Sequence, residues 1–297
     1  MTLTPRIVVV HRRTERDELV ARHGTRGQAA FFLSSRGRSL EEVDERHRAV
    51  RDALATVTAA IPIDWRRADA ERADLDRFLF TPDDVVIVVG QDGLVANVAK
   101  YLHGQPVIGV DPEPDRNPGV LVAHDAESVG EVLRAVVEDA AAYEPRTMVE
   151  AVTDDGQSIV ALNEVFVGHP SHQSARYRLR PEGAEERQSS SGLIVSTGTG
   201  ATGWCRSLWL QSGSHLDLPG PTERRLVWLV REPWPSPATG ISLVEGVLGD
   251  GQALRVVAET DGLVVFGDGI ESDRLILRWG QELEVHVAER NLQLVRT

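Results

Sequence analysis

Short apolar runs alternate with longer stretches of helical periodicity in the first half of the chain. The runs cover residues 7–10, 85–89 and 106–110, and continuous runs of this length are typical of strands buried on both faces of a parallel sheet. Between them, the spacing of apolar positions predicts helices over residues 14–33, 39–60, 93–102 and 126–142. Ser39 and Glu42 have the spacing of a capping box at the start of the second helix. This alternation predicts a doubly wound α/β domain.

The second half of the chain has a different pattern, in which short strand-like segments are separated by glycine, proline, aspartate or serine turns. The predicted strands cover residues 160–167, 175–179, 192–196, 226–230, 254–258, 262–266, 275–279, 283–287 and 291–295. One helix candidate follows Gly203, and Asp268–Gly269 is typical of a hairpin turn. We therefore expect a sandwich-like β domain at residues 146–297, after an α/β domain at residues 1–145.

Composition narrows the class of protein. With 297 residues, 41% of them hydrophobic and 26% charged, the chain can form an ordinary core and is not disordered in bulk. A single cysteine, Cys205, excludes an intrachain disulfide and a thiolate metal cluster. A net charge of -13 without a basic tract argues against nucleic-acid binding. No apolar run approaches the roughly 18 residues of a membrane span, and no signal-peptide pattern precedes the first strand. The default expectation is a soluble intracellular protein.

The loop Gly90-Gln91-Asp92-Gly93 is the first candidate for chemistry. It follows a predicted central strand, and ligands of open α/β sheets bind at that end of the strands. The start of the next helix directs free N–H groups toward the same crevice, which suits a phosphate. Asp92 is then a general base or a carboxylate beside a metal, or else simply the N-cap of the helix. Lys100, in that helix, is expected to be a surface residue, with phosphate neutralisation as the alternative.

Two further motifs lie in the second half. Residues 196–204 contain the spacing G-x-G-x-x-G, but this segment lies inside a β-rich region, so a binding loop of another kind is favoured over a hydride-transfer fold. Asn163 and Glu164 interrupt an apolar strand, where polar groups cost free energy unless they are paired. Either one of them faces solvent, or both line a polar pocket. The chain has neither a P-loop nor a G-x-S-x-G motif.

Taken in order, three motifs resemble those of the NAD kinases. They are the Gly-Gln-Asp-Gly loop, the segment Leu-Asn-Glu at residues 162–164, and Gly-Leu-Ile-Val-Ser-Thr-Gly-Thr-Gly at residues 192–200. The family's usual forms are G-G-D-G, N-E and G-D-G-L-x-V-S-T-P-T-G-S-T-A-Y. Segments 106–116, 161–166 and 190–193 are most similar to the mitochondrial-type branch. The resemblance spans about residues 5–295 and implies an NAD kinase-like fold, an α/β domain followed by a β-sandwich-like domain.

The resemblance also implies an activity, which is transfer of the ATP γ-phosphate to the adenosine 2'-hydroxyl of NAD, with Mg2+. Asp92 would be the catalytic base, and Arg176, Arg178 and Arg206 would supply cations to the phosphates. The positions matched to nucleotide binding are Gly90, Gln91, Gly93, Asn163, Glu164, Thr197, Thr199, Gly200, Thr202, Gly203, Trp204 and Arg176. The family further implies a cytoplasmic homodimer or homotetramer, assembled through the β domain.

Departures from the family pattern leave alternatives open. Gln91 replaces the second glycine of the loop, Leu94 replaces a threonine, and Ser191 stands where the common branch has an aspartate. The same fold would then phosphorylate another acceptor, such as a sugar, a nucleoside or another nucleotide. A further alternative is a dinucleotide-binding regulator with weak catalysis.

Overall fold

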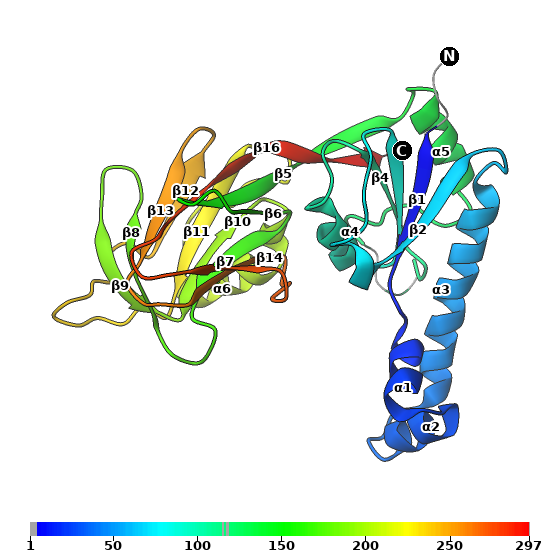
Figure 1. The fold of residues 1–297 in the computed structure, drawn as a ribbon, viewed down its shortest axis with the longest axis horizontal. Helices are drawn as coiled ribbons and strands as arrows, with labels where there is room; N and C mark the ends of the chain where they lie inside the picture. The colour runs from blue at the N-terminus through cyan, green and yellow to red at the C-terminus, as the bar shows by residue number, and fades with distance from the viewer. Residues whose placement is uncertain (1–4, 115, 117–118, 297) are drawn as a thin grey trace. The chain divides into compact units, whose positions relative to one another are not determined.

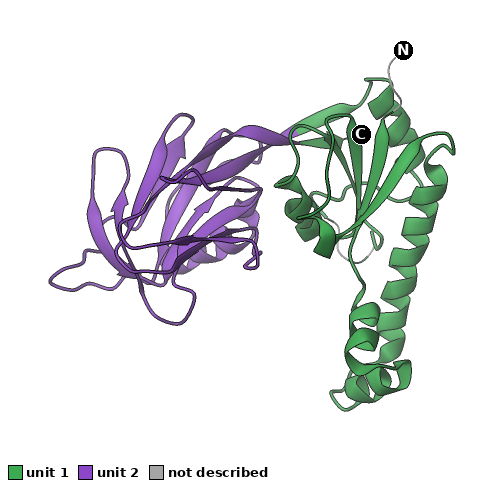
Figure 2. Cartoon of the chain, in the orientation of Figure 1, with its two compact units in different colours: residues 1–144, 293–297 green, residues 145–292 purple. Residues whose placement is uncertain are grey.

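The computed structural model describes residues 5–114, 116 and 119–296. The chain divides into two compact units, one formed by residues 1–144 and 293–297 and the other by residues 145–292 (Figure 2). The sequence placed the division one residue later, and it assigned the last five residues to the second part. None of the described helices is long and apolar enough to cross a membrane.

The first unit contains a parallel sheet. Its strands are β1 (Arg6–His11), β2 (Arg66–Glu71), β3 (Asp84–Val89) and β4 (Pro106–Val110), in the order β2-β1-β3-β4. The end of β16 (Glu282–Arg296) adds a further parallel strand beside β4 through the pair Gln293 and Pro106. Every residue of β3 is buried, as its continuous apolar run predicts. β2 was not predicted, because its sequence alternates arginine, alanine and acidic residues.

Helices surround this sheet. They are α1 (Glu15–His23), α2 (Arg26–Ser34), α3 (Leu40–Ala60), α4 (Asp92–Ala99) and α5 (Val129–Val137), with a 3-10 turn at Arg72–Asp74. The second half of α3 packs on the sheet with α5, whereas α1 and α2 pack on its first half, away from the sheet (Figure 1). The single helix predicted over residues 14–33 is wrong, because Gly24, at φ +80°, ends α1 and Thr25 caps α2.

The second unit is a sandwich of two sheets, as expected. One has the order β16-β13-β8-β9, in which β5 also pairs with β16 and β6 pairs with β5. Its further strands are β5 (Ala142–Thr153), β6 (Ser158–Ala161), β8 (Ala175–Arg180), β9 (Glu186–Ser190) and β13 (Ala253–Ala258). The other has the order β12-β11-β10-β7-β14-β15, formed by β7 (Glu164–Gly168), β10 (Gly192–Ser196), β11 (Arg225–Arg231), β12 (Glu245–Gly249), β14 (Leu263–Gly267) and β15 (Arg274–Leu277). Apolar side chains from both sheets form one core between them.

Two predicted segments of this unit differ from the structure. The strand predicted over residues 160–167 is two strands, β6 and β7, with Leu162 and Asn163 between them. The strands predicted over residues 283–287 and 291–295 are one continuous strand, β16. A helix, α6 (Trp204–Ser212), follows a 3-10 turn at Gly200–Thr202, and its side chains pack on the outer face of the β7–β10–β11 sheet.

Candidate functional site

In the first unit, the Asp92 side chain connects the loop at residues 90–93 to the loop at residues 119–122. The N–H groups of Val120, Leu121 and Val122 donate to its carboxylate at 2.9, 2.8 and 3.2 Å. A Cβ added to Gly119 would lie 2.7 Å from Asp92 Oδ1, so only glycine fits at that position. A carboxylate has about four lone-pair positions, and these three bonds therefore leave one for a substrate hydroxyl.

The sequence also allowed Asp92 to be the N-cap of the following helix, but in the structure Asp92 does not occupy that position. Gln91 occupies the cap position of α4 without a side-chain cap bond, and Asp92 is the first residue of the helix. The expectation of a surface Lys100 is also wrong, because only 7% of this side chain is exposed. Its ammonium lies 5.0 Å from the centre of the Tyr101 ring. The short helix α4 is buried along its whole apolar length, and it carries Lys100 inward with it.

In the second unit, the Asn-Glu motif and the threonine–glycine loop are joined directly. The ladder between β7 and β10 sets Glu164 opposite Ser196. Beyond this pair, the Thr197 N–H donates to Asn163 O at 2.9 Å, and the Thr197 hydroxyl donates to Leu162 O at 2.6 Å. Two motifs that lie more than 30 residues apart thus form one rigid structure.

The glycines of that loop pack against protein backbone. A Cβ added to Gly200 would lie 2.2 Å from Asn163 O, and one added to Gly198 would lie 1.9 Å from Gly220 O. In a dinucleotide fingerprint, by contrast, glycines make room for the pyrophosphate. The loop is therefore not a hydride-transfer fingerprint, in agreement with the weight that the sequence gave to that interpretation.

Asp268 is a residue of this site that sequence reasoning missed. Its carboxylate accepts the N–H groups of Leu162 at 2.9 Å and Asn163 at 2.7 Å, and its own N–H donates to Glu164 O at 3.1 Å. These bonds replace strand pairing at the break between β6 and β7. The expected turn at Asp268–Gly269 is present between β14 and β15, but its aspartate also orients the Asn-Glu motif.

Glu164 lies in an environment that disfavours its charge. Its side chain is buried, and burial, followed by repulsion from Asp268, raises its pKa to about 7. Asn163 beside it is partly exposed, and its side-chain amide makes no hydrogen bond within the described residues. The sequence left open whether one of these two residues faces solvent or both line a polar pocket. In the structure Glu164 is buried and Asn163 is partly exposed, where a ligand can reach it.

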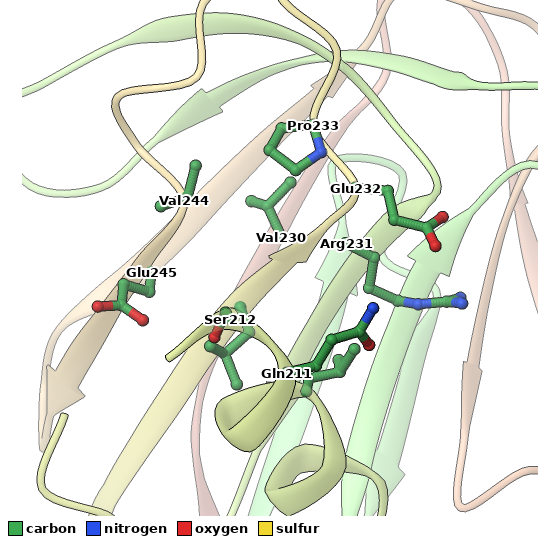
Figure 3. Close-up of a pocket in the computed structure, with 10 residues that line it drawn as sticks. Gln211, Ser212, Val230, Arg231, Glu232, Pro233, Val244 and Glu245 are labelled. Atoms are coloured by element: carbon green, nitrogen blue, oxygen red, sulfur yellow. The ribbon is translucent and has the colours of Figure 1, made fainter. Parts of the chain in front are cut away.

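An aromatic cluster lies beside the loop. The rings of Trp204 and Phe166 stack with centres 5.5 Å apart, and Phe266 lies 4.9 Å from Phe166. The Arg231 guanidinium lies 5.1 Å from the centre of the Trp204 ring. Figure 3 shows Arg231 at the edge of a cavity of about 280 Å³ between α6, β11 and β12. None of the residues matched to nucleotide binding lines this cavity, except that Trp204 contacts its rim through Arg231.

Arg146 is a second residue that the sequence did not indicate. Only 3% of it is exposed, and its guanidinium donates to the Thr199 hydroxyl at 3.4 Å. Thr197 holds the other side of the same loop, because its hydroxyl accepts the N–H groups of Thr199 and Gly200 at 3.1 and 3.3 Å. Thr202 and Gly203 are exposed at the end of the loop.

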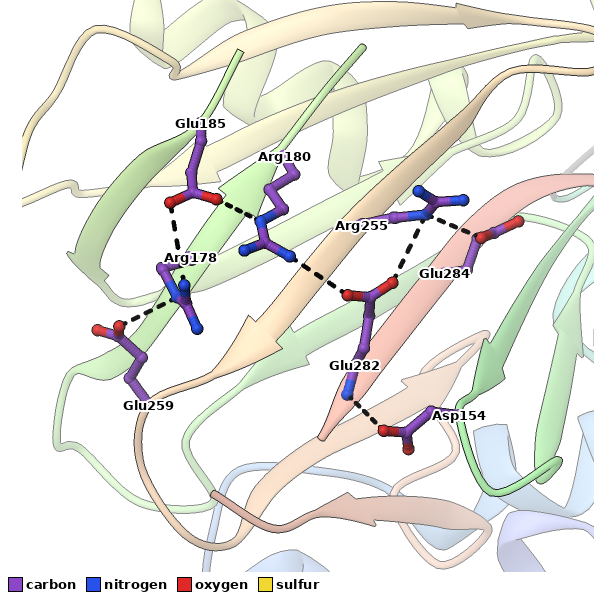
Figure 4. A network of polar contacts seen from close by, with 8 residues as sticks. All are labelled: Asp154, Arg178, Arg180, Glu185, Arg255, Glu259, Glu282 and Glu284. Carbon is purple, nitrogen blue, oxygen red and sulfur yellow. Dashed lines mark hydrogen bonds and ion pairs between the residues drawn. The ribbon is translucent and has the colours of Figure 1, made fainter. Parts of the chain in front are cut away.

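Two of the three arginines proposed as phosphate ligands are not brought to this cluster, whereas Arg206 lies in α6, two residues after Trp204. Arg176 and Arg178 alternate along β8 with the core residues Tyr177 and Leu179, so they face outward from the other sheet of the sandwich. Arg178 pairs there with Glu259 at 3.3 Å, within the network of ion pairs in Figure 4. Strand alternation places Arg176 on the outer face of the other sheet, away from the loop at residues 197–203 within this unit, and its assignment to nucleotide binding stays a prediction.

Known proteins are similar to this chain in sequence. No family model matches the chain. An NAD kinase of Caldicellulosiruptor saccharolyticus is 26% identical over 257 residues, which cover 85% of this chain and 90% of the relative. An NAD kinase of Methylococcus capsulatus is 33% identical over 133 residues, which cover 42% of this chain and 44% of the relative. The chain is thus similar to NAD kinases along most of its length.

Two solved structures share the fold of this chain. Yeast NADH kinase in complex with NADH has a TM-score of 0.66 at 15% identity, and the match covers 100% of this chain and 84% of that one. An NAD kinase of Archaeoglobus fulgidus in complex with ATP has a TM-score of 0.59 at 18% identity, over 98% and 93% of the two chains. The resemblance to the mitochondrial-type branch of the NAD kinase family stays a prediction.

The resemblance to NAD kinases implies a divalent cation, for which protein side chains could supply ligands. Within the described residues, no three histidine, cysteine, aspartate or glutamate side chains gather in a group that could bind a metal. Mg2+ typically keeps several waters and binds through one or two carboxylates together with substrate phosphates. Among the described residues the side chains thus form no cage for a cation, and a cation that accompanies the nucleotide phosphates would need none.

Replacing Glu164 with glutamine is expected to stabilise the protein against unfolding at high pH only. Folding raises the pKa of the Glu164 carboxyl group from 4.5 to about 7. The folded protein therefore loses stability as the pH increases across that interval, because the carboxyl group ionises more readily in the unfolded chain. The penalty above pH 7 is about 3.5 kcal/mol at most, since one pKa unit corresponds to roughly 1.4 kcal/mol. Urea unfolding of E164Q and wild type at pH 5 and pH 8 measures it.

The matched control for this measurement is Glu232→Gln, which alters an exposed carboxylate in the same unit. E232Q should unfold like the wild type at both pH values. An E164Q variant that gains the same stability at pH 5 as at pH 8 would show that ionisation of Glu164 carries no penalty.

Proposed function

We propose that this chain transfers the γ-phosphate of ATP to the 2'-hydroxyl of the adenosine ribose of NAD, which gives NADP and ADP. The observation that carries the proposal is the junction of the Asn163–Glu164 motif with the loop at residues 197–203, held together by Thr197 and Asp268. This geometry presents amide, hydroxyl and aromatic groups on one rigid structure, as recognition of an adenosine requires. The proteins that match the chain bear the name NAD kinase.

In the proposed reaction, Asp92 acts as the general base. The 2'-oxygen of NAD attacks the γ-phosphorus, the bond from that phosphorus to the bridging oxygen breaks, and ADP leaves. The proton of the 2'-hydroxyl passes to the one carboxylate position of Asp92 that the three backbone N–H groups leave open. Mg2+, bound with ATP, would supply positive charge to the phosphates.

The second unit would hold the dinucleotide. The unengaged Asn163 amide is proposed to bond the ribose side, and Glu164 the adenine side. Trp204, steadied by its stack on Phe166, offers a flat apolar surface for the adenine ring. Arg146 is proposed to fix Thr199, and thereby the loop that contacts the nucleotide.

Two departures from the family pattern lie in and directly after the phosphate loop, at Gln91 and Leu94. Leu94 is buried, with 5% of it exposed, so this position turns an apolar side chain inward where the family has a hydroxyl. Gln91 is exposed and is available to a phosphate. We propose that Gln91, Gly90 and Gly93 contact the donor, and that the chain works in the cytoplasm as a homodimer or homotetramer, as the family resemblance implies.

A panel of acceptors tests the proposed function. The purified chain is supplied with ATP, Mg2+ and one acceptor at a time, and release of ADP is measured with NAD, NADH, adenosine and glucose. We expect release with NAD or NADH that exceeds the rate without acceptor, and no stimulation by adenosine or glucose. Stimulation by a sugar or a nucleoside alone would replace the dinucleotide by that acceptor.

A further inference from the structure

An open recess lies on the α1–α2 hairpin of the first unit, far along the chain from every motif residue. The two helices close on the start of α3 around a small core of Leu19, Ala29 and Leu33. On another side of the hairpin they leave a recess of about 540 Å³, here called the α1–α2 recess. Its lining residues are Arg22, His23, Gly27, Gln28, Phe31, Phe32, Ser35 and Arg36.

The charge of the α1–α2 recess is opposite to that of the chain. Arg22, His23 and Arg36 line it, and no carboxylate does. Among the residues that the structure describes, no carboxylate oxygen comes within 4.0 Å of the guanidinium groups of Arg22 and Arg36. In a chain with a net charge of -13, two neighbouring arginines without acidic partners mark a place that attracts anions.

A neighbouring recess on the same helices shows the contrast. There Arg16 and Arg26 both pair with Asp44, at 2.9 and 2.6 Å. Glu41 and Glu45 line the same recess. In this neighbouring recess, acidic side chains neutralise the arginines. The excess of positive charge is therefore a property of the α1–α2 recess and not of these helices in general.

Aromatic rings complete the α1–α2 recess. Phe31 is 76% exposed, which leaves its ring open to a partner. The ring of Phe32 lies 4.3 Å from His23 and 3.9 Å from the Arg36 guanidinium, measured to the Phe32 centre. Arg36 is held there, because one of its nitrogens donates to Phe32 O at 3.2 Å and to the Ser35 hydroxyl at 3.0 Å. Its remaining N–H groups are available to an anion.

We propose that the α1–α2 recess binds a nucleotide, with the base against Phe31 and the phosphates on Arg22 and Arg36. Guanidinium groups bind phosphates through paired charge-assisted hydrogen bonds, and phenylalanine rings stack with bases. A volume of about 540 Å³ lies in the range of sites for ligands of this size. The site is additional to the proposed catalytic one, since none of its residues belongs to the kinase motifs.

Photochemical labelling of the full chain tests the proposal. The probe is 8-azido-ATP, and the labelled peptides are identified by mass spectrometry after proteolysis. We expect saturable labelling within residues 20–40, protected by ATP. The variant R22Q/R36Q should weaken this labelling about tenfold for each arginine removed. Phe31→Ala should weaken it about tenfold by loss of stacking.

The matched control is R48Q/R51Q, which removes the same charge from exposed positions of α3. It should label residues 20–40 like the wild type, and an equal loss in the control would reduce the effect to net charge and overturn the proposal. No saturable labelling of residues 20–40 would also overturn it. Inorganic pyrophosphate should compete with the probe more weakly than ATP does. Equal competition would show that the base makes no contact in the recess, which would overturn the proposal of a nucleotide site. Because labelling is read at residues 20–40, these results do not depend on whether the chain phosphorylates NAD.

Discussion

Replacing Asp92 with asparagine is expected to lower kcat for NADP formation by about 10²–10⁴-fold, the usual contribution of a general base. The asparagine retains one acceptor oxygen but cannot take the proton of the ribose hydroxyl. Its NH2 group would also face backbone N–H donors that the carboxylate now accepts. Steady-state kinetics with NAD and ATP measure kcat, and binding of NAD to the same variant shows whether the ground state is intact.

Asp125→Asn is the matched control for this variant. Asp125 also accepts a backbone N–H, from Ser128 at 2.7 Å, but it belongs to no motif. Its replacement should leave kcat within a factor of about three, because it removes a local cap and no proton acceptor. If D92N kept wild-type kcat, Asp92 would hold the loop at residues 119–122 and would not be the base.

Replacing Asp268 with alanine is expected to destabilise the second unit by about 3–6 kcal/mol, since hydrogen bonds to a charged acceptor contribute roughly 1.5–3 kcal/mol each. Two such bonds, to the N–H groups of Leu162 and Asn163, are lost. The segment between β6 and β7 would no longer hold Asn163 in place, so KM for NAD should rise about tenfold or more, by the cost of misplacing a binding residue. Chemical unfolding and steady-state kinetics measure the two effects.

Asp250→Ala is the matched control for that change. Asp250 pairs with Arg224 on the surface, and an exposed ion pair contributes little. This variant should keep both wild-type stability and wild-type KM. Loss of stability in D268A without any change in KM would mean that Asp268 supports the sandwich alone and does not orient the binding motif.

Removal of Asp268 has a consequence for its neighbour. Repulsion from Asp268 is the second cause of the raised pKa of Glu164, after burial. The pKa of Glu164 should therefore fall toward its ordinary value in D268A but remain raised, because burial persists. The hydrogen bonds of Asp268 to residues 162–164 join these residues in one site, and this repulsion acts within it.

The fold was largely predictable because its signals are local. Runs such as residues 85–89 and the regular turns of the second half are read directly from neighbouring residues. The loop at residues 90–93 and the segment at residues 192–200 were recognisable for the same reason. Their glycines and threonines stand in unbroken order beside the strands that carry them.

The missing parts of the site depend on contacts between distant residues. Asp268 meets Asn163 across 105 positions of the chain, and Arg146 meets Thr199 across 53. The residues that flank Asp268 and Arg146 in the sequence do not indicate these contacts. In its local sequence, Asp268 is an ordinary turn residue. Lys100 was misplaced for a related reason, because burial of a lysine is set by what packs around α4 and not by the helix itself.

Direct detection of NADP is the measurement that tests the central claim. The purified chain is incubated with NAD, ATP and Mg2+, and the product is read with a dehydrogenase that accepts NADP and rejects NAD. The proposed mechanism predicts NADP that accumulates with time, in proportion to the enzyme and to the ADP released, and that nearly disappears in D92N. Binding of NAD without any NADP, from ATP or from any other phosphate donor, would contradict it.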